Sequence, residues 1–318
     1  MELGKLSPKL MEKLIFPYLG APNTRVELGP AVGEDAAVIN VEGEKYLVVS
    51  SDPIVGADEE MGFYLVHINA NDVASKGGDP SFFITTIIVP ESWNENALEN
   101  LMREIDRECK KIKISLIGGH TEVTKKFKYP ILSGTMFGFA PKLMKADNIR
   151  PGDKIILTKG AGIEGTSILA RVFKEELSKV LKETELIEAL ELKEKISVVE
   201  EARILRKWAV FMHDPTEGGI LGGLYELKLR SGLNININLE DIPIPQITQK
   251  ICSYFKIDPL KLIGSGALLA VIPESDIEDA IATLLNHGIK ANVIGTFTDK
   301  DGNLPYSEGD ELWKLLSW

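Results

Sequence analysis

The sequence predicts a mixed α/β protein of two domains, which becomes α+β wherever its strands pair antiparallel. Runs rich in valine, isoleucine and phenylalanine alternate along the 318 residues with longer segments whose apolar residues recur every three or four positions. A polar, proline-bounded stretch, PKLMKADNIRPGDK, separates two halves whose element order differs. We therefore expect an N-terminal domain at residues 1–148, with a mixed sheet and helices, and a C-terminal α/β domain at residues 149–318.

The first half begins with a predicted helix, because Ser7 suits an N-cap and Pro8 the first helical position. A second helix starts at Met61 and ends before the pair Gly77 and Gly78, which is a common helix stop. The expected order is helix 7–16, strands 35–41 and 45–52, helix 61–76, strand 82–89, helix 95–112, and strands 115–123 and 130–140.

The second half alternates strands and helices more regularly, which is typical of an α/β domain. The sequence alone leaves open whether these strands pair parallel or antiparallel. The expected order is strand 154–160, a helical region over about 165–207, strand 210–214, helix 215–230, strand 234–240, helix 245–255, strand 267–273, helix 274–288 and strand 291–297.

The charge balance argues against a nucleic-acid partner. The net charge is −11, the pI is near 5.1, and the short basic runs KKIK and KKFK are bracketed by acidic residues. An acidic surplus does not exclude a nucleotide, because carboxylates can hold Mg²⁺ that in turn binds phosphate. The Lys/Glu-rich helices and the many isoleucines are weakly typical of a thermophile.

The chain shows no membrane or redox signature. No segment approaches the about 18 uninterrupted apolar residues of a spanning helix, and MELGKLSPKLMEKLIF lacks the features of a signal peptide. We therefore expect a cytoplasmic protein without a membrane partner. Cys109 and Cys252 match no metal or redox spacing, which favours two reduced structural thiols.

Acidic residues gather where predicted strands and helices end. Taken singly, each has a structural explanation: Asp52 before Pro53 suits a turn, Asp214 suits an N-cap, and Asp72 suits an exposed helix face. Together, and beside Gly, Ser or Pro, they indicate a site that admits a phosphate-bearing ligand with Mg²⁺. The residues concerned are Asp35, Asp52, Asp72, the pair His120 and Glu122, and Asp214.

Glycine-rich stretches offer a second possible anion contact. In TKGAGIEGTSILA the glycines stand between a strand and a helix, where free N–H groups can hold an anion. This is not a P-loop, since Thr166 stands where the lysine is needed. The turn Gly264 to Gly266 suits either a tight turn or a phosphate-facing loop. Of the four histidines, only His120 and His213 have glycines and carboxylates as sequence neighbours. A zinc site or a Ser-His-Asp triad therefore has no support.

The motifs GPAVGEDAAVI, SSDPIV, NDVASKGGDP, GGHTEV, HDPTEGGI and GSGALLAV occur in this order along nearly the whole chain. This series resembles the aminoimidazole ribonucleotide synthetase (PurM-like) superfamily, and most closely its HypE family of hydrogenase maturation factors. Selenophosphate synthetase and thiamine-monophosphate kinase also belong to it, and these enzymes use ATP to activate an oxygen or to transfer a phosphate. The resemblance implies a two-domain architecture, a homodimer paired through the N-terminal domain, and Mg-ATP bound between the domains.

The resemblance also implies roles for individual residues. Mg²⁺ would be held by Asp35, Asp52 and Asp72, with Asp214 contributing from the second domain, and the adjacent Glu34 and Asp35 would be balanced by the metal rather than by a salt bridge. The residues expected to contact ATP are Asp35, Asp52, Asn71, Asp72, Gly118, Gly119, Thr121, Gly162 and Gly165, and those expected to take part in catalysis are His120, Glu122 and Asp214.

The sequence departs from the HypE pattern at three places. His120 and Glu122 replace an aspartate and a lysine, and Glu217 replaces an arginine, so two cations are lost at a phosphate site. HypE chains close on a cysteine that receives a carbamoyl group, whereas this chain ends in ELWKLLSW. We expect that end to be an ordered structural segment, with no carbamoylation of the chain on itself.

Three functions therefore remain open. The first is an ATP-dependent enzyme that acts on a separate small molecule or on the thiol of another protein. The second is a non-catalytic ATP-binding paralogue that acts in maturation or regulation by binding another protein, such as a hydrogenase-maturation protein. The third, a HypE reaction on Cys109 or Cys252, is disfavoured because both lie in predicted helices.

Overall fold

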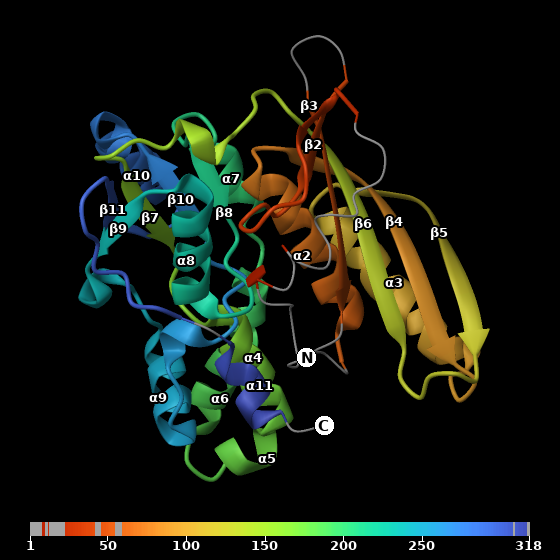
Figure 1. Cartoon of the computed structure of the whole chain (residues 1–318). Coiled ribbons are helices and arrows are strands. Elements are labelled where there is room, and N and C mark those ends of the chain that lie inside the picture. The colour runs from red at the N-terminus through yellow and green to blue at the C-terminus, as the bar shows by residue number, and fades with distance from the viewer. Residues whose placement is uncertain are drawn as a thin grey trace. The chain divides into compact units, whose positions relative to one another are not determined.

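The computed structural model describes residues 8, 9, 12, 23–41, 46–54, 59–307 and 309–316. These residues form two compact units (Figure 1). The N-terminal unit consists of Arg25–Leu28 and Asp35–Leu143, and the C-terminal unit contains Gly29–Glu34 and the chain from Met144 on. Most of the helix expected at 7–16, and Trp318 of the expected C-terminal segment, lie outside the described residues.

The N-terminal unit is a six-stranded mixed sheet covered by two helices (Figure 1). Its strand order is β1-β2-β3-β6-β4-β5, in which β4 and β5 pair parallel and every other neighbouring pair is antiparallel. The strands are β1 (Val26–Leu28), β2 (Ala37–Asn40), β3 (Tyr46–Ile54), β4 (Asp79–Pro90), β5 (Ser115–Thr124) and β6 (Ile131–Ala140). Side chains alternate between the faces, so that Phe83 and Ile87 of β4 and Met136 of β6 are buried under the helices.

Helices α2 (Met61–Ser75) and α3 (Glu95–Lys111) have different sequence patterns because they lie at different depths. Helix α2 packs on β3, β4 and β6 beneath α3, so almost all of its side chains are buried and apolar residues occur on every side of the helix. Helix α3 is amphipathic: Leu101 and Ile105 are buried, and the Asn94 side chain caps its first turn by accepting from the N–H of Ala97 at 2.9 Å.

The C-terminal unit contains a five-stranded sheet of order β8-β10-β7-β11-β9, whose neighbours all pair antiparallel. The α+β alternative therefore holds for this half of the chain. The strands are β7 (Lys154–Thr158), β8 (Phe211–His213), β9 (Asn234–Ile237), β10 (Leu269–Ile272) and β11 (Ala291–Thr298). Strands β7 and β10 are buried along almost their whole length, which explains their nearly continuous apolar runs.

Helices make up most of the rest of this unit (Figure 1). The helical region expected over 165–207 is interrupted in the structure, because short turns divide it into α4, α5, α6 and α7. The core includes Ile155, Phe211, Leu224 and Leu269. The helices are α4 (Ile163–Val172), α5 (Lys174–Leu177), α6 (Glu183–Glu191), α7 (Val199–Leu205), α8 (Gly219–Ser231), α9 (Gln246–Phe255), α10 (Ile277–Asn286) and α11 (Glu311–Leu315).

The segment around α11 is a folded part of the C-terminal unit, as the leucine spacing predicts. Leu312 and Leu316 are 1% and 4% exposed, and the Asp310 side chain caps the helix by accepting from the N–H of Leu312 at 2.7 Å. None of the helices in the described ranges is long and apolar enough to cross a membrane.

Candidate functional site

Two of the predicted metal ligands, Asp35 and Asp72, are joined by serine hydroxyls. Asp72 lies in the last turn of α2 and is buried, and Asp35 precedes β2. The Oγ of Ser50 lies 2.5 Å from Oδ2 of Asp72 and 3.1 Å from the carbonyl oxygen of Asp35. The Oγ of Ser75 lies 2.8 Å from Oδ2 of Asp35 and 2.8 Å from the carbonyl oxygen of Asp72. Each hydroxyl therefore contacts the carboxylate of one aspartate and the backbone carbonyl oxygen of the other, so that Asp35 and Asp72 form one cluster.

A buried lysine stands beside this cluster. Lys76 caps the C-terminal end of α2, its side chain is fully buried, and its Nζ lies 3.7 Å from Oδ2 of Asp35. Sequence reasoning missed this residue, although a lysine between small residues at the end of a buried helix is an available signal. A buried ammonium is costly unless a carboxylate balances it, so Lys76 and Asp35 stabilise each other.

The third predicted ligand, Asp52, is placed by its backbone. The side-chain amide of Asn69 accepts from the N–H of Asp52 at 2.9 Å and donates to its carbonyl oxygen at 3.3 Å. The Asp52 side chain is half-buried on β3, whereas Asn71 is fully buried on α2 next to Asp72. The structure thus fixes where Asp52 lies, and its contact with a metal stays a prediction, as does the contact of Asn71 with ATP.

The donor set suits magnesium. Mg²⁺ is usually bound in proteins by one or two carboxylates and completes its shell with waters and substrate phosphates. The carboxylates of Asp35 and Asp72 and the nearby hydroxyls offer only oxygen. Across residues 23–41, 46–54, 59–307 and 309–316, no three His, Cys, Asp or Glu side chains form a metal-holding group. The pair therefore fits an ion that takes its other ligands from water and from a phosphate.

The predicted residues of GGHTEV lie on β5, the edge strand of the sheet. Asp52 of β3 pairs with Gly134 of β6, Gly134 with Thr85 of β4, and Thr85 with Gly119 of β5. At about 4.8 Å per strand, Gly119 is therefore roughly 14 Å from Asp52 along this row. The side chains of His120 and Glu122, 3.5 Å apart, cannot share one ion with Asp52 in the same sheet.

Strand β5 is largely exposed, and its backbone comes close to that of β4 at Gly119. His120, Thr121 and Glu122 are exposed. A Cβ on Gly119 would lie 2.4 Å from the carbonyl oxygen of Thr85, whereas one on Gly118 would meet open space. Gly119 is thus required for strand pairing, which explains it without a ligand, while the contacts of Gly118 and Thr121 with ATP remain predictions.

In the C-terminal unit, Asp214 follows β8 and is 1% exposed. The neighbouring His213 pairs through Nε2 with Oε2 of Glu226 on α8 at 2.9 Å. This contact gives His213 a structural partner inside the unit. A role of Asp214 in metal binding or catalysis stays a prediction.

Gly162 and Gly165 begin α4, and their surroundings are closely packed. Gly162 has φ of +71°, which favours glycine at this N-cap. The N–H of Gly165 donates to the carbonyl oxygen of Ile263 at 3.2 Å, and a Cβ there would lie 2.4 Å from Leu262. Because that N–H is already used within the unit, any phosphate bound by this loop needs other donors.

A second acidic cluster, which the sequence did not indicate, lies beside this loop. Burial raises the pKa of Glu164 to about 7, the negative charges of Asp310 and Glu217 add to the shift, and Ser265 opposes it. Burial likewise raises the pKa of Asp310 to about 6, against the hydrogen bonds from the N–H groups of Leu312 and Gly218. Both carboxyl groups therefore titrate close to neutral pH, because burial disfavours their charged forms more than these hydrogen bonds favour them.

Glu34 departs from the role implied by the resemblance. Its Oε1 lies 2.6 Å from Nε of Arg230 on α8, and its side chain is 1% exposed. The expectation that a metal rather than a salt bridge balances both Glu34 and Asp35 is therefore wrong: an arginine far away in the sequence neutralises Glu34, and the buried Lys76 pairs with Asp35. Arg230 lies 196 positions away, so no local pattern could indicate this partner.

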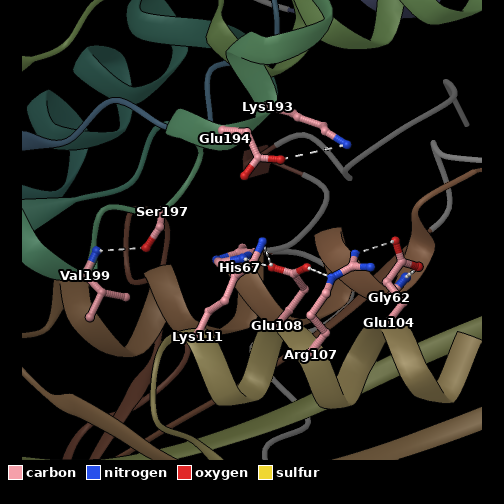
Figure 2. A network of polar contacts seen from close by, with 10 residues as sticks. All are labelled: Gly62, His67, Glu104, Arg107, Glu108, Lys111, Lys193, Glu194, Ser197 and Val199. Atoms are coloured by element: carbon pink, nitrogen blue, oxygen red, sulfur yellow. Dashed lines mark hydrogen bonds and ion pairs between the residues drawn. The ribbon is translucent and has the colours of Figure 1, made fainter.

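Figure 2 shows a different kind of buried carboxylate in the N-terminal unit. Glu108 of α3 has a fully buried side chain that contacts Nε2 of His67 at 3.2 Å, Nε of Arg107 at 2.7 Å and Nζ of Lys111 at 2.9 Å. Burial acts to raise the pKa of Glu108, but these hydrogen bonds outweigh it and lower the pKa to about 2. The network joins α2 to α3 and includes none of the predicted site residues.

Both cysteines are buried, as expected of structural thiols. Burial raises the pKa of Cys109 to about 11 and that of Cys252 to about 12, and neighbouring carboxylates add to both shifts. Only a very small fraction of either thiol is thiolate at neutral pH. Neither group is prepared to act as a nucleophile.

The fold and the N-terminal carboxylate cluster define a two-domain protein of the PurM-like class. Residues 33–140 match the N-terminal domain of AIR synthase related proteins, and residues 150–305 match the C-terminal domain. The chain belongs to the AIR synthase related family, which confirms the resemblance seen in the motif series.

Relatives in this family carry several names. A putative hydrogenase expression/formation protein of Methanocaldococcus jannaschii is 28% identical over 309 residues, which cover 93% of this chain and 88% of that protein. Carbamoyl dehydratase HypE of Rhizobium leguminosarum is 24% identical, covering 83% and 76% of the two chains. Thiamine-monophosphate kinase of Pyrococcus abyssi is 27% identical, covering 78% and 79%.

Solved structures share the fold over nearly the whole chain. Hydrogenase maturation protein HypE in complex with ATP matches with a TM-score of 0.68 at 22% identity, covering 94% of this chain and 89% of that one. AaThiL complexed with AMPPCP and TMP matches with a TM-score of 0.76 at 18% identity, covering 96% and 99%. These matches confirm the two-domain mixed α/β architecture.

Proposed function

We propose that the protein is an ATP-dependent enzyme that binds Mg-ATP and activates an oxygen of a separate acceptor by phosphorylation or dehydration. The observation that carries the proposal is the cluster of Asp35 and Asp72 joined by Ser50 and Ser75, inside the region that matches the family's N-terminal domain. Relatives named as a dehydratase and as a kinase, and fold neighbours that hold ATP or AMPPCP, support the same class of chemistry.

In this proposal the chain's own residues bind and orient the nucleotide. Asp35 and Asp72 would hold Mg²⁺, and Asp52 would join them from β3. The bound ion supplies charge neutralisation for the triphosphate. The serine hydroxyls keep the two carboxylates in place before the ligand arrives, which reduces the ordering needed on binding. His120, Glu122 and Asp214 are the proposed catalytic groups.

The acceptor is proposed to be a separate molecule because neither Cys109 nor Cys252 is suited to the task. Both thiols are buried, and burial raises the pKa of each well above neutral pH. An acceptor must reach the γ-phosphate and present an oxygen that takes the phosphoryl group while ADP leaves. A small molecule with such an oxygen, or a carbamoyl group carried on an exposed thiol of a hydrogenase-maturation protein, meets both needs.

We also propose that the protein is a homodimer paired through the N-terminal unit. Apolar side chains are exposed on the edge strand β5, with Ile117 at 57% and Val123 at 64%, and on the neighbouring strands. An exposed apolar edge strand is unfavourable in an isolated sheet and is commonly covered. Light scattering should show a dimer at micromolar concentration, and a stable monomer would contradict this. The cytoplasmic location stays a prediction.

A second candidate is a non-catalytic ATP-binding partner protein, and one contact favours it. The Oε2 of Glu217 accepts from Nε1 of Trp313 at 3.1 Å. The residue that replaces the family's arginine thus has a structural role beside α11 rather than a cationic role toward phosphate. Steady-state turnover of ATP separates the two functions, since the binding protein should release neither ADP nor AMP.

The decisive experiment combines binding and turnover. Asp72→Asn should weaken ATP binding strongly in Mg²⁺ and little in EDTA, because only the metal-dependent part involves the carboxylate. Asp106→Asn on the exposed face of α3 is the matched control and should change neither. Calorimetry gives the affinities, and an assay that separates ADP from AMP gives the product. Equal affinity of Asp72→Asn and wild type in Mg²⁺ would remove Asp72 from the metal site.

A further inference from the structure

Lys76 is a completely buried lysine in the N-terminal unit. It lies inside the motif NDVASKGG, directly after α2, and its residue is 1% exposed. Lysine is rarely buried so completely, because its ammonium loses its hydration. Its Nζ lies 3.7 Å from Oδ2 of Asp35, the same oxygen that the Ser75 hydroxyl contacts at 2.8 Å.

The position of Lys76 matters because of what Asp35 is proposed to bind. An ammonium and a divalent cation are both attracted to the Asp35 carboxylate, and they repel each other across it. The Lys76 ammonium lies beside the Asp35 carboxylate and so reduces the negative charge that the cluster of Asp35 and Asp72 presents. A metal ion that arrives alone therefore meets a weaker negative field than the two carboxylates by themselves would provide.

We propose that Lys76 is a positioning residue that makes divalent-metal binding depend on the nucleotide, an inference that rests on the proposed function. The ammonium lowers the affinity of the carboxylate cluster for the free ion. A polyphosphate restores that affinity, because its negative charge compensates both the metal and the ammonium. The metal and the nucleotide thus bind as a unit, and neither fills the site well alone.

The competing interpretation is that Lys76 only stabilises the fold. In that case its ammonium would serve Asp35 as a counter-ion, and its removal would lower the melting temperature without changing metal affinity. The two roles are separable because Lys76→Met keeps most of the aliphatic stem and removes only the charge. Lys110→Met is the matched control, since Lys110 is an exposed lysine on α3 paired with Asp106.

The test measures Mn²⁺ binding to the full chain by calorimetry, first without nucleotide and then with a non-hydrolysable ATP analogue. Lys76→Met should bind Mn²⁺ alone at least tenfold more tightly than wild type, and the gain in Mn²⁺ affinity caused by the analogue should shrink by a similar factor. Lys110→Met should match wild type. Thermal unfolding confirms that each variant is folded, and Lys76→Gln replaces Lys76→Met if the latter fails to fold.

Unchanged Mn²⁺ affinity in folded Lys76→Met would overturn the inference. If Asp72→Asn still weakens Mg-ATP binding in that case, the proposed function stands without a role for Lys76. Failure of Mn²⁺ to bind either wild type or Lys76→Met, with or without the analogue, would overturn the inference together with the metal site. Binding of ATP in EDTA would then show whether the nucleotide part of the proposed function survives.

Discussion

Glu108 in the N-terminal unit and Glu164 in the C-terminal unit are both buried glutamates on helices, yet their pKa values shift in opposite directions. Burial acts to raise both, but His67, Arg107 and Lys111 lower the pKa of Glu108 to about 2. Burial raises the pKa of Glu164 to about 7, and the nearby negative charges of Asp310 and Glu217 add to the shift. Burial opposes the charged form of both groups, and at Glu108 alone of the two do cationic partners outweigh it.

The difference matters for what each region can do. Glu108 remains a permanent anion that joins α2, which carries Asp72, to α3 (Figure 2). Glu164 changes its charge near neutral pH, and its Oε2 has no hydrogen-bond partner among the described residues. Glu108 is therefore expected to keep its charge over the physiological pH range, whereas Glu164 is expected to change its charge within it.

The largest effect is expected when Glu108 is neutralised. Glu108→Gln should lower the free energy of unfolding at pH 7 by roughly 3 kcal/mol, because the buried side chain loses the strength of its hydrogen bonds as a charged acceptor. Chemical denaturation measures the loss. Since the folded pKa is lowered from 4.5 to about 2, the stabilisation by Glu108 is present above pH 4.5 and is lost as the pH falls toward 2. An unchanged variant at pH 7 would show that the network contributes nothing.

These two glutamates also show how far sequence reasoning reaches. Strands such as 82–89 and helices such as 95–112 can be predicted from the sequence, because their hydrophobic period and caps depend on neighbouring residues. The structure has both within a few positions of the predicted bounds. The order of the sheets is not local, and neither are the partners of buried charges. Glu34 pairs with Arg230, the charge of Asp310 raises the pKa of Glu164, and Lys76 pairs with Asp35.

For the candidate site, the sequence indicates the individual residues but not which of them lie together. Asp35 and Asp72 were identified by motif, and the structure joins them, although only folding shows that Ser50 and Ser75 lie between them. His120 and Glu122 were identified in the same way, and the strand order places them three strands from Asp52. Motifs thus indicate which residues matter, but strand register decides which of them meet.

An intermediate effect, of opposite sign, is expected at Glu164. The folded pKa of Glu164 is about 7, above its usual 4.5, so its contribution to stability is most favourable below pH 4.5 and is lost as the pH rises through 7. Glu164→Gln removes the charge at every pH. It should therefore raise the free energy of unfolding at pH 8 by about 1–2 kcal/mol and change it little at pH 4.5.

Denaturation of wild type and Glu164→Gln at pH 4.5 and pH 8 tests this. Glu311→Gln is the control, because the carboxylate of Glu311 on α11 already pairs with Nζ of the exposed Lys314 at 2.7 Å. This control should not reproduce the gain in stability at pH 8. A Glu164→Gln protein that is equally affected at both pH values would show that Glu164 does not change its charge in this range.

The smallest effect is expected at an ion pair on the same helix as Glu108. The Arg103 guanidinium lies 2.6 Å from Oε1 of Glu99, but both side chains are more than half exposed, at 74% and 58%. Water solvates both groups in the unfolded and the folded protein, so the pair gains little from its short distance. Arg103→Gln should change the free energy of unfolding by less than about 0.5 kcal/mol, and salt should reduce even this. A loss as large as that of Glu108→Gln, measured by the same denaturation at pH 7, would show that proximity alone, rather than burial with several partners, stabilises carboxylates on α3.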